Sequence, residues 1–149
     1  MRKNNNRILV LDPNESAQHD IYKILGSEQF SLVVCSQLVD AVKALKETRF
    51  KCAIVDIDLP EIPGYRVVPI LKAINPALPI ILTTETNSRD LEIRVREQDV
   101  FFYYIKSFDS QELRLAVLEA LRVSNVDVEA DGERKQHEAG SKPDPAGRP

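Results

Sequence analysis

Two aspartates separated by a single residue, Asp56 and Asp58, follow directly after an apolar run of the sequence. Pro60 and Gly64 come shortly afterwards, and both residue types are common in turns. Paired carboxylates of this kind have three interpretations, namely a nucleophile for group transfer, a set of metal ligands, or an ordinary acidic turn. The choice depends on which other side chains reach the same place.

Three more polar residues, Asp12, Thr84 and Lys106, stand where other short apolar runs end. If these runs are parallel strands, their carboxyl ends meet at one edge of a sheet, which is where ligands bind in such folds. Two carboxylates, a hydroxyl and an ammonium group would then converge in one crevice with Asp56 as a possible nucleophile. This combination suits phosphoryl capture, because a metal ion and an ammonium group offset the repulsion between carboxylate and phosphate.

The elements that must position these side chains alternate along the chain. Short apolar runs predict strands at residues 7–11, 31–35, 52–55, 79–82 and 100–105. Apolar residues at helical spacing predict helices at residues 17–25, 40–48, 65–74, 88–98 and 110–123, although the fourth also shows a strand-like alternation. Five such units predict an α/β fold, with a five-stranded parallel sheet of order 2-1-3-4-5 and helices on both faces.

The chain of 149 residues is expected to form one domain over residues 7–124. Residues 125–149 are polar, lack periodicity and contain several Pro and Gly, which predicts a disordered C-terminal tail. The net charge of -3 gives no electrostatic reason to expect nucleic-acid binding. No apolar run is long enough to predict a membrane span, and the N-terminus lacks the pattern of a signal peptide, so we expect a cytoplasmic protein.

The two cysteines, Cys35 and Cys52, provide a check on the predicted strand order. Both lie in apolar, β-branched surroundings and are expected to be buried free thiols. In the order 2-1-3-4-5 their strands flank the first strand, so two spacings of about 4.8 Å separate them. Because a disulfide requires a Cα separation below about 7 Å, a bond between these cysteines would contradict the order.

Taken together, these motifs resemble the receiver domain of bacterial response regulators, which act in two-component signal transduction. The similarity extends from about residue 7 to residue 123. The residues that carry it are Asp56 followed by Pro60 and Gly64, then Thr84, Tyr103, Lys106 and Phe108.

The resemblance implies a role for each of the matching residues. Asp56 would be the phosphoacceptor, assisted by Thr84 and Lys106, while Thr84 and Tyr103 would form the switch. Asp12, Asp56 and the backbone carbonyl of Asp58 would hold Mg²⁺, and the side chain of Asp58 would either point to solvent or serve as an extra ligand.

It also implies partners rather than stand-alone catalysis. A histidine kinase or phosphotransfer protein would supply the phosphoryl group, and a downstream protein would read the phosphorylated state. A homodimer through the fourth helix, fifth strand and fifth helix is a further implication.

Four positions depart from the family pattern. Pro13 replaces the second acidic residue after the first strand, which is generally a metal ligand, so Mg²⁺ binding is expected to be weaker. Glu85 replaces a small residue after Thr84, where its carboxylate would repel a phosphoryl group or replace the missing ligand. Ser107 replaces a proline after the lysine, and Asp99 replaces a glycine before the fifth strand.

Two other functions remain open at this point. A pseudo-receiver would keep the fold as an interaction module but would have lost phosphorylation through Pro13 and Glu85. The residues Asp56 and Asp58 also fit the motif of haloacid-dehalogenase-like phosphatases. That motif normally follows the first strand, however, and here the pair follows the third.

Overall fold

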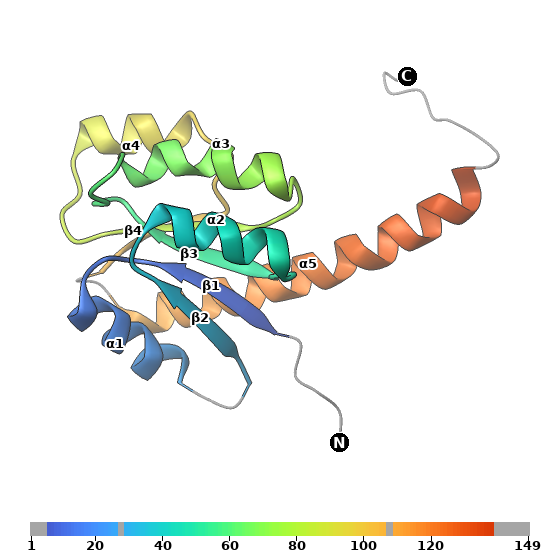
Figure 1. The fold of residues 1–149 in the computed structure, drawn as a ribbon, viewed down its shortest axis with the longest axis horizontal. Helices are drawn as coiled ribbons and strands as arrows, with labels where there is room; N and C mark the ends of the chain where they lie inside the picture. The colour runs from blue at the N-terminus through green and yellow to red at the C-terminus, as the bar shows by residue number, and fades with distance from the viewer. Residues whose placement is uncertain (1–5, 27–28, 107–108, 139–149) are drawn as a thin grey trace.

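The structure is a computed structural model that describes residues 6–26, 29–106 and 109–138. Strands and helices alternate along these residues, as the sequence predicts (Figure 1). The strands are β1 (Arg7–Leu11), β2 (Ser31–Cys35), β3 (Cys52–Asp56), β4 (Ile80–Thr84) and β5 (Phe102–Ile105). The helices are α1 (Glu15–Leu25), α2 (Leu38–Glu47), α3 (Gly64–Ile74), α4 (Arg89–Arg96) and α5 (Ser110–Glu138).

The strands form one parallel sheet in the order β2-β1-β3-β4-β5, which confirms the predicted topology. The inner strands are continuous apolar runs because both of their faces are covered by helices. Every residue of β3 and β4 is buried. The sheet is therefore the rigid element on which the strand-end residues are mounted.

Each strand sends alternate side chains to two separate cores. One core lies under α1 and α5 and takes residues such as Ile8, Val10 and Ile54 from the sheet. The other lies under α2, α3 and α4 and takes residues such as Leu9 and Val55. Figure 1 shows the two helical layers on opposite sides of the sheet. This alternation also decides on which side of the sheet each strand-end residue projects.

Side-chain caps begin two of the helices close to the predicted positions. Asn14 precedes α1, and its Oδ1 accepts a hydrogen bond from the backbone N of Ala17 at 2.9 Å. Ser88 precedes α4, and its Oγ accepts one from the backbone N of Leu91 at 3.1 Å. Such caps satisfy backbone donors that the first turn of a helix leaves unpaired. The cap at Ser88 and the packing of Leu91 and Val95, which lie four residues apart, together favour a helix over residues 89–96 despite their strand-like alternation.

The last helix is longer than the sequence analysis predicts. α5 extends to Glu138, so residues 125–138 are helical where a disordered tail was expected, and Figure 1 shows this part projecting beyond the sheet. The polar composition of this segment limits burial, but Ala, Glu, Lys and Arg are strong helix formers. Leu121 is the last residue described as buried. The domain boundary at residue 124 stays a prediction.

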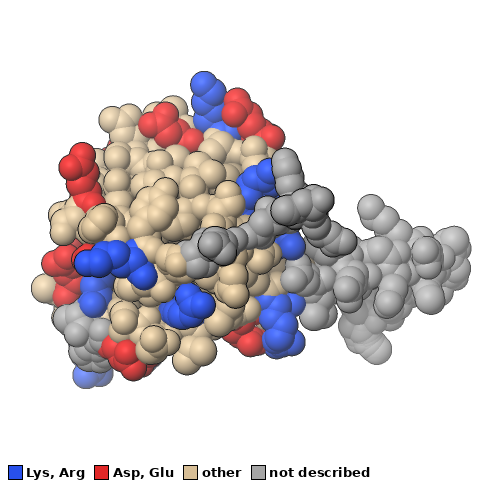
Figure 2. All heavy atoms as spheres, turned by 90° about the horizontal axis from the view of Figure 1, so that it is seen from below, with Lys and Arg blue, Asp and Glu red and all other residues tan. Residues whose placement is uncertain are grey.

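Two further expectations concern the chain as a whole. Cys35 and Cys52 are free and buried, as predicted, and they lie on the two strands that flank β1. Among the described residues, none of the helices has the length and apolarity required to cross a bilayer. Figure 2 shows acidic and basic side chains interspersed over the viewed face, without a continuous basic stripe among its described residues.

Candidate functional site

The carboxyl ends of three strands bring Asp12, Asp56 and Lys106 into direct contact. Asp12 follows β1, Asp56 is the last residue of β3, and Lys106 follows β5. The Lys106 Nζ lies 3.0 Å from Asp12 Oδ2 and 2.9 Å from Asp56 Oδ1. One ammonium group therefore bridges two carboxylates from different strands, and we call these three residues the acid–lysine cluster.

The acid–lysine cluster is largely shielded from water. The side chains of Asp12 and Asp56 are 2% and 7% exposed, and that of Lys106 is 18% exposed. Buried charges persist only when they are paired and hydrogen-bonded. Asp12 Oδ1 accepts a hydrogen bond from the backbone N of Asn14 at 3.0 Å, and Asp56 Oδ2 accepts one from the backbone N of Asp58 at 3.0 Å.

Burial and charge shift the pKa values of two members of the cluster. Burial raises the pKa of Asp12, an effect that the hydrogen bonds from Asn14 and Lys106 only partly offset. Burial alone would lower the pKa of Lys106, but its hydrogen bonds to Asp56 and Asp12 outweigh that effect, and the pKa is raised. Lys106 therefore stays protonated and can act as a fixed positive charge.

The hydroxyl group in contact with Asp56 belongs to Thr83 and not to Thr84. Thr83 Oγ1 donates a hydrogen bond to Asp56 Oδ1 at 3.0 Å. The Thr84 hydroxyl instead donates to the backbone O of Thr86 at 2.8 Å. The register pairs Asp56 with Thr83, so these two side chains project from the same face of the sheet and Thr84 projects from the other. The period of two in a strand implies that only one of the two adjacent hydroxyls faces Asp56, and the register of β4 against β3 decides that it is Thr83.

Tyr103 lies on the α4 side of the sheet, away from the acid–lysine cluster. Its hydroxyl donates a hydrogen bond to Asn87 Oδ1 at 2.7 Å, and Asn87 Nδ2 donates to Glu92 Oε2 at 2.5 Å. We call Asn87, Glu92 and Tyr103 the tyrosine network. Burial, with a smaller contribution from the negative charge of Glu92, raises the pKa of Tyr103. The network joins β5 to the loop before α4 and to the first turn of that helix.

The glycine eight residues after Asp56 has a steric function. A Cβ atom on Gly64 would lie 2.1 Å from the backbone O of Asp56 and 2.8 Å from the Cα of Ile57. The Gly64 backbone N donates a hydrogen bond to the Ile57 O at 2.8 Å. The N-terminus of α3 therefore packs directly on the backbone that carries Asp56, and only glycine permits this approach.

The aromatic run before Lys106 is more buried than a free interaction surface would be. Tyr104 is 3% exposed and packs in the core under α1 and α5, while Phe101 and Phe102 are partly buried against the same core. Ile93 on α4 and Leu115 on α5 are the more exposed apolar side chains of this region. Ser107 and Phe108, which the sequence analysis singled out, lie outside the described residues.

The departures from the family pattern have structural consequences. Asn14 follows Pro13, and its side-chain oxygen is engaged as the cap of α1. Asp58 and Glu85 are both exposed. Asp58 nevertheless contributes its backbone N–H to Asp56, so the turn after β3 orients the carboxylate through the main chain.

The carboxylates present suit a magnesium ion with few protein ligands. Among the described residues there is no group of three or more His, Cys, Asp or Glu side chains arranged to hold a metal. Mg²⁺ usually keeps several waters and binds through one or two carboxylates together with phosphate oxygens. Asp12 and Asp56 can supply such a pair, so the residues fit an ion that is bound mainly with a phosphorylated substrate.

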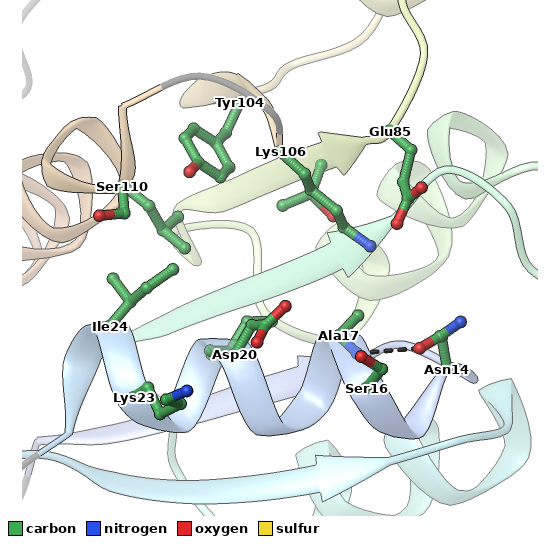
Figure 3. A pocket seen from close by; sticks show the side chains of 13 residues that line it. Asn14, Ser16, Ala17, Asp20, Lys23, Ile24, Glu85, Tyr104, Lys106 and Ser110 are labelled. Carbon is green, nitrogen blue, oxygen red and sulfur yellow. Dashed lines mark hydrogen bonds between the residues drawn. The ribbon is translucent and has the colours of Figure 1, made fainter.

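A cavity of about 580 Å³ opens beside Lys106, between α1 and the start of α5. Figure 3 shows Lys106 and Glu85 on one side of it and residues of α1, such as Asp20 and Ile24, on the other. Thr83 also lines this cavity. A small ligand in this cavity would contact Lys106 and Thr83, because cavities of a few hundred Å³ accommodate small ligands.

Comparisons with known proteins agree with this geometry. The family model of the response regulator receiver domain matches residues 8–118. Among curated proteins, the transcriptional regulatory protein ZraR of Klebsiella oxytoca is 25% identical over 114 residues, covering 76% of this chain and 26% of ZraR. The DNA-binding transcriptional regulator NtrC of Proteus hauseri is 28% identical over 119 residues, covering 80% of this chain and 24% of NtrC. The chain thus spans about a quarter of the length of these relatives.

Solved structures show the same fold. The signal receiver domain of an HD domain-containing protein from Pseudomonas fluorescens superposes with a TM-score of 0.79 at 22% identity, covering 87% of this chain and 96% of that one. A CheY-like receiver domain protein from Methanospirillum hungatei gives a TM-score of 0.74 at 19% identity, covering 82% of this chain and 98% of that one.

Proposed function

Because the chain belongs to the response regulator receiver family, we propose that Asp56 accepts a phosphoryl group from a histidine kinase or a phosphotransfer protein. The observation that carries the proposal is the contact of Lys106 Nζ with Asp56 Oδ1 at 2.9 Å. This contact places a permanent positive charge beside a buried carboxylate, which is an arrangement suited to receiving an anionic group.

Each residue around Asp56 has a separate role in the proposed phosphoryl transfer. Oδ2 of Asp56 accepts a hydrogen bond from the Asp58 N–H, which points the carboxylate toward the strand-end edge of the sheet. Lys106 reduces the repulsion between that carboxylate and an approaching phosphate. Asp12 and Asp56, with the backbone carbonyl of Asp58, would hold Mg²⁺, and the ion would supply further positive charge. Since Pro13 contributes no acidic ligand, the affinity for Mg²⁺ would be lower than is usual in the family.

Phosphorylation would be read out on the α4 side of the sheet. Thr84 and Tyr103 are the proposed switch residues, and both make hydrogen bonds to the loop that follows β4. A phosphoryl group adds about -1.5 to -2 units of charge. If the Thr84 hydroxyl turns toward that charge, its bond to Thr86 O breaks, and the loop and the tyrosine network rearrange. The beryllofluoride-activated receiver domain of NtrC4 is a dimer, which supports the proposal of a homodimer. The exposed side chains of Ile93 on α4 and Leu115 on α5 make the α4, β5 and α5 face the proposed interface.

The remaining parts of the proposal follow from the family. The protein would act in the cytoplasm as a signalling domain without stand-alone catalysis, and a downstream protein would be its output partner. The mixed surface charge in Figure 2 and the net charge of -3 are consistent with protein partners. Membership of the receiver family leaves the dehalogenase-like phosphatase without support.

A phosphorylation-independent pseudo-receiver is the second candidate. It is favoured by Pro13, which supplies no acidic ligand, and by Asn14, whose side-chain oxygen is engaged as the cap of α1. Glu85 adds a carboxylate that lines the same cavity as Lys106. In this case the cluster would be a structural remnant, and the surface of α4, β5 and α5 would bind its partner constitutively.

Intact mass after incubation with acetyl phosphate and Mg²⁺ tests the first candidate. One phosphoryl adduct is expected on the wild type and on Asp58→Asn, whose side chain is exposed, and none on Asp56→Asn. Absence of an adduct on the wild type at high Mg²⁺ would reject phosphorylation by this donor. Labelling that appears only in Pro13→Asp would identify the protein as a pseudo-receiver.

A further inference from the structure

Thr83 is held opposite Asp56 by the sheet itself. The two residues are register partners in the parallel β3–β4 pair, and the backbone N of Ile57 donates to the Thr83 O at 2.8 Å. Thr83 is 1% exposed, and its hydroxyl donates to Asp56 Oδ1 at 3.0 Å. A hydroxyl mounted within a buried strand cannot leave its partner through a loop movement.

The two oxygens of the Asp56 carboxylate are consequently not equivalent. Oδ1 accepts hydrogen bonds from both the Lys106 ammonium and the Thr83 hydroxyl. Oδ2 accepts the backbone N–H of Asp58. A carboxylate oxygen has two acceptor positions. Both positions of Oδ1 are occupied by these donors, whereas Oδ2 retains a lone pair that can attack phosphorus. The position on Oδ1 that Lys106 holds would be open to Mg²⁺ once the ammonium group turns toward a phosphoryl group.

We propose that Thr83 is a positioning residue that directs the attack through Oδ2 and shortens the lifetime of the acyl phosphate that forms. This inference rests on the proposed function. In the forward step, an electron pair of Oδ2 forms a bond to phosphorus while the bond from phosphorus to the donor's leaving atom breaks, which is a ring nitrogen in a phosphohistidine and an oxygen in acetyl phosphate. The electron pair of that broken bond departs with the leaving group, which is acetate when acetyl phosphate is the donor.

The effect on lifetime follows from where the charge lies during hydrolysis. A water oxygen then bonds to phosphorus, the bond from Oδ2 to phosphorus breaks, and its electron pair returns to the carboxylate while the protons of water go to the released phosphate and solvent. Oδ1 is a carbonyl oxygen in the acyl phosphate and regains negative charge as this bond breaks. Hydrogen bonds to charged acceptors are stronger than those to neutral ones. The Thr83 hydroxyl therefore stabilises the leaving carboxylate more than the acyl phosphate.

Lys106 is less suited to this task than Thr83. Its ammonium group is shared with Asp12 Oδ2, and its side chain is more exposed than either carboxylate. A flexible ammonium group can turn toward the oxygens of a phosphoryl group. When it does so, Thr83 is left as the side-chain donor to Oδ1, because its place in β4 is fixed.

The test compares Thr83→Val, which keeps the shape without the hydroxyl, with Thr83→Ser, which keeps the hydroxyl without the methyl group. Each protein is labelled with acetyl phosphate and Mg²⁺, the donor is removed, and the loss of the adduct is followed by intact mass. We expect the adduct to decay about fivefold more slowly in Thr83→Val, the factor that corresponds to one ordinary hydrogen bond. Thr83→Ser is expected to decay at the wild-type rate.

A spectroscopic measurement separates the hydrogen bond from packing. With carboxyl-labelled aspartate, the infrared band of the acyl-phosphate carbonyl is expected at higher frequency in Thr83→Val than in the wild type and Thr83→Ser. If Thr83 only fills space, Val will match the wild type and Ser will differ, and the proposal is then wrong. Thr83→Ala provides a second variant without the hydroxyl, and wild-type decay in any folded Ala or Val variant overturns the inference. If the wild type is not phosphorylated, both the proposed function and this inference are wrong. If the wild type is phosphorylated but the adduct decays at the same rate in Thr83→Val and Thr83→Ala, only the inference is wrong.

Discussion

The acid–lysine cluster and the tyrosine network lie at the same edge of the sheet, but they are built in different ways. The cluster places two buried carboxylates around one ammonium group and is supported by strand residues and main-chain N–H groups. The network joins partly exposed polar side chains across a loop. The buried ion pairs of the cluster are strong and costly to disrupt because the protein interior has a low dielectric constant. The partly exposed hydrogen bonds of the network compete with water and contribute less. A buried, closely paired cluster thus lies beside a network of weaker, partly exposed contacts.

The two adjacent threonines at the end of β4 show this division within one dipeptide. Both are buried, but Thr83 donates its hydrogen bond to Asp56, whereas Thr84 donates to the loop that leads to the tyrosine network. Substitutions in the cluster should therefore change the free energy of unfolding by about 1 kcal/mol or more. Substitutions in the network should change it by less than about 1 kcal/mol.

The largest effect is expected for Lys106→Met. Removing the ammonium group leaves two buried carboxylates without their shared counter-charge, and the free energy of unfolding should fall by about 3 kcal/mol at neutral pH. Urea denaturation in the presence of a metal chelator measures this loss of unfolding free energy. The matched control, Lys43→Met on the exposed surface of α2, should change stability by less than about 0.5 kcal/mol. Equal effects of the two substitutions would mean that the cluster is no more strongly coupled than the surface.

Gly64→Ala should disturb the cluster from the other side of Asp56. The added Cβ would overlap the backbone O of Asp56, so α3 or the end of β3 must shift. We expect a loss of about 2 kcal/mol in unfolding free energy, as for overpacked cores, together with slower labelling of Asp56. Thermal denaturation and intact mass measure the two effects. Unchanged labelling with reduced stability would show that α3 moves and the carboxylate does not.

Asp12→Asn should act in the opposite direction and stabilise the protein by about 1 kcal/mol at neutral pH, because it removes a desolvated charge next to Asp56. The pKa of Asp12 is raised in the folded state, so folding favours its protonated form. The destabilisation by Asp12 is therefore present above the folded pKa and diminishes as the pH falls through it. Melting curves of both proteins with chelator should converge in acid. A difference between the two melting temperatures that grows as the pH falls would contradict the raised pKa of Asp12.

The smallest effect is expected for Glu92→Gln in the tyrosine network. The substitution keeps an acceptor for Asn87 but removes a negative charge, so the pKa of Tyr103 should decrease toward its ordinary value. Stability should change by less than about 0.5 kcal/mol. Absorbance titration, with Tyr103→Phe to identify the signal, measures the pKa. Glu97→Gln, on the exposed end of the same helix, is the control and should leave the titration unchanged.

The sequence predicted most of the fold because its signals are local. Five apolar runs alternate with helical periodicity, and this pattern constrains the sheet to a few parallel topologies, of which the observed order is one. Helix ends were less well predicted. Low apolar content after residue 124 predicts disorder, but α5 continues to Glu138, because a helix requires backbone hydrogen bonds and suitable residues rather than burial.

The candidate site also has features that the sequence predicted and features that only the structure revealed. The sequence by itself determined that Asp12, Asp56 and Lys106 stand at strand ends and therefore meet, because parallel strands place their carboxyl ends at one edge. Only the tertiary structure decided which hydroxyl joins them, since Thr83 and Thr84 are equally placed in the sequence and are separated by the register of β4 against β3. It also decided that one lysine bridges both carboxylates, and that Gly64 lies against the Asp56 backbone. These are contacts between segments distant in the chain, and they depend on packing that no local pattern encodes.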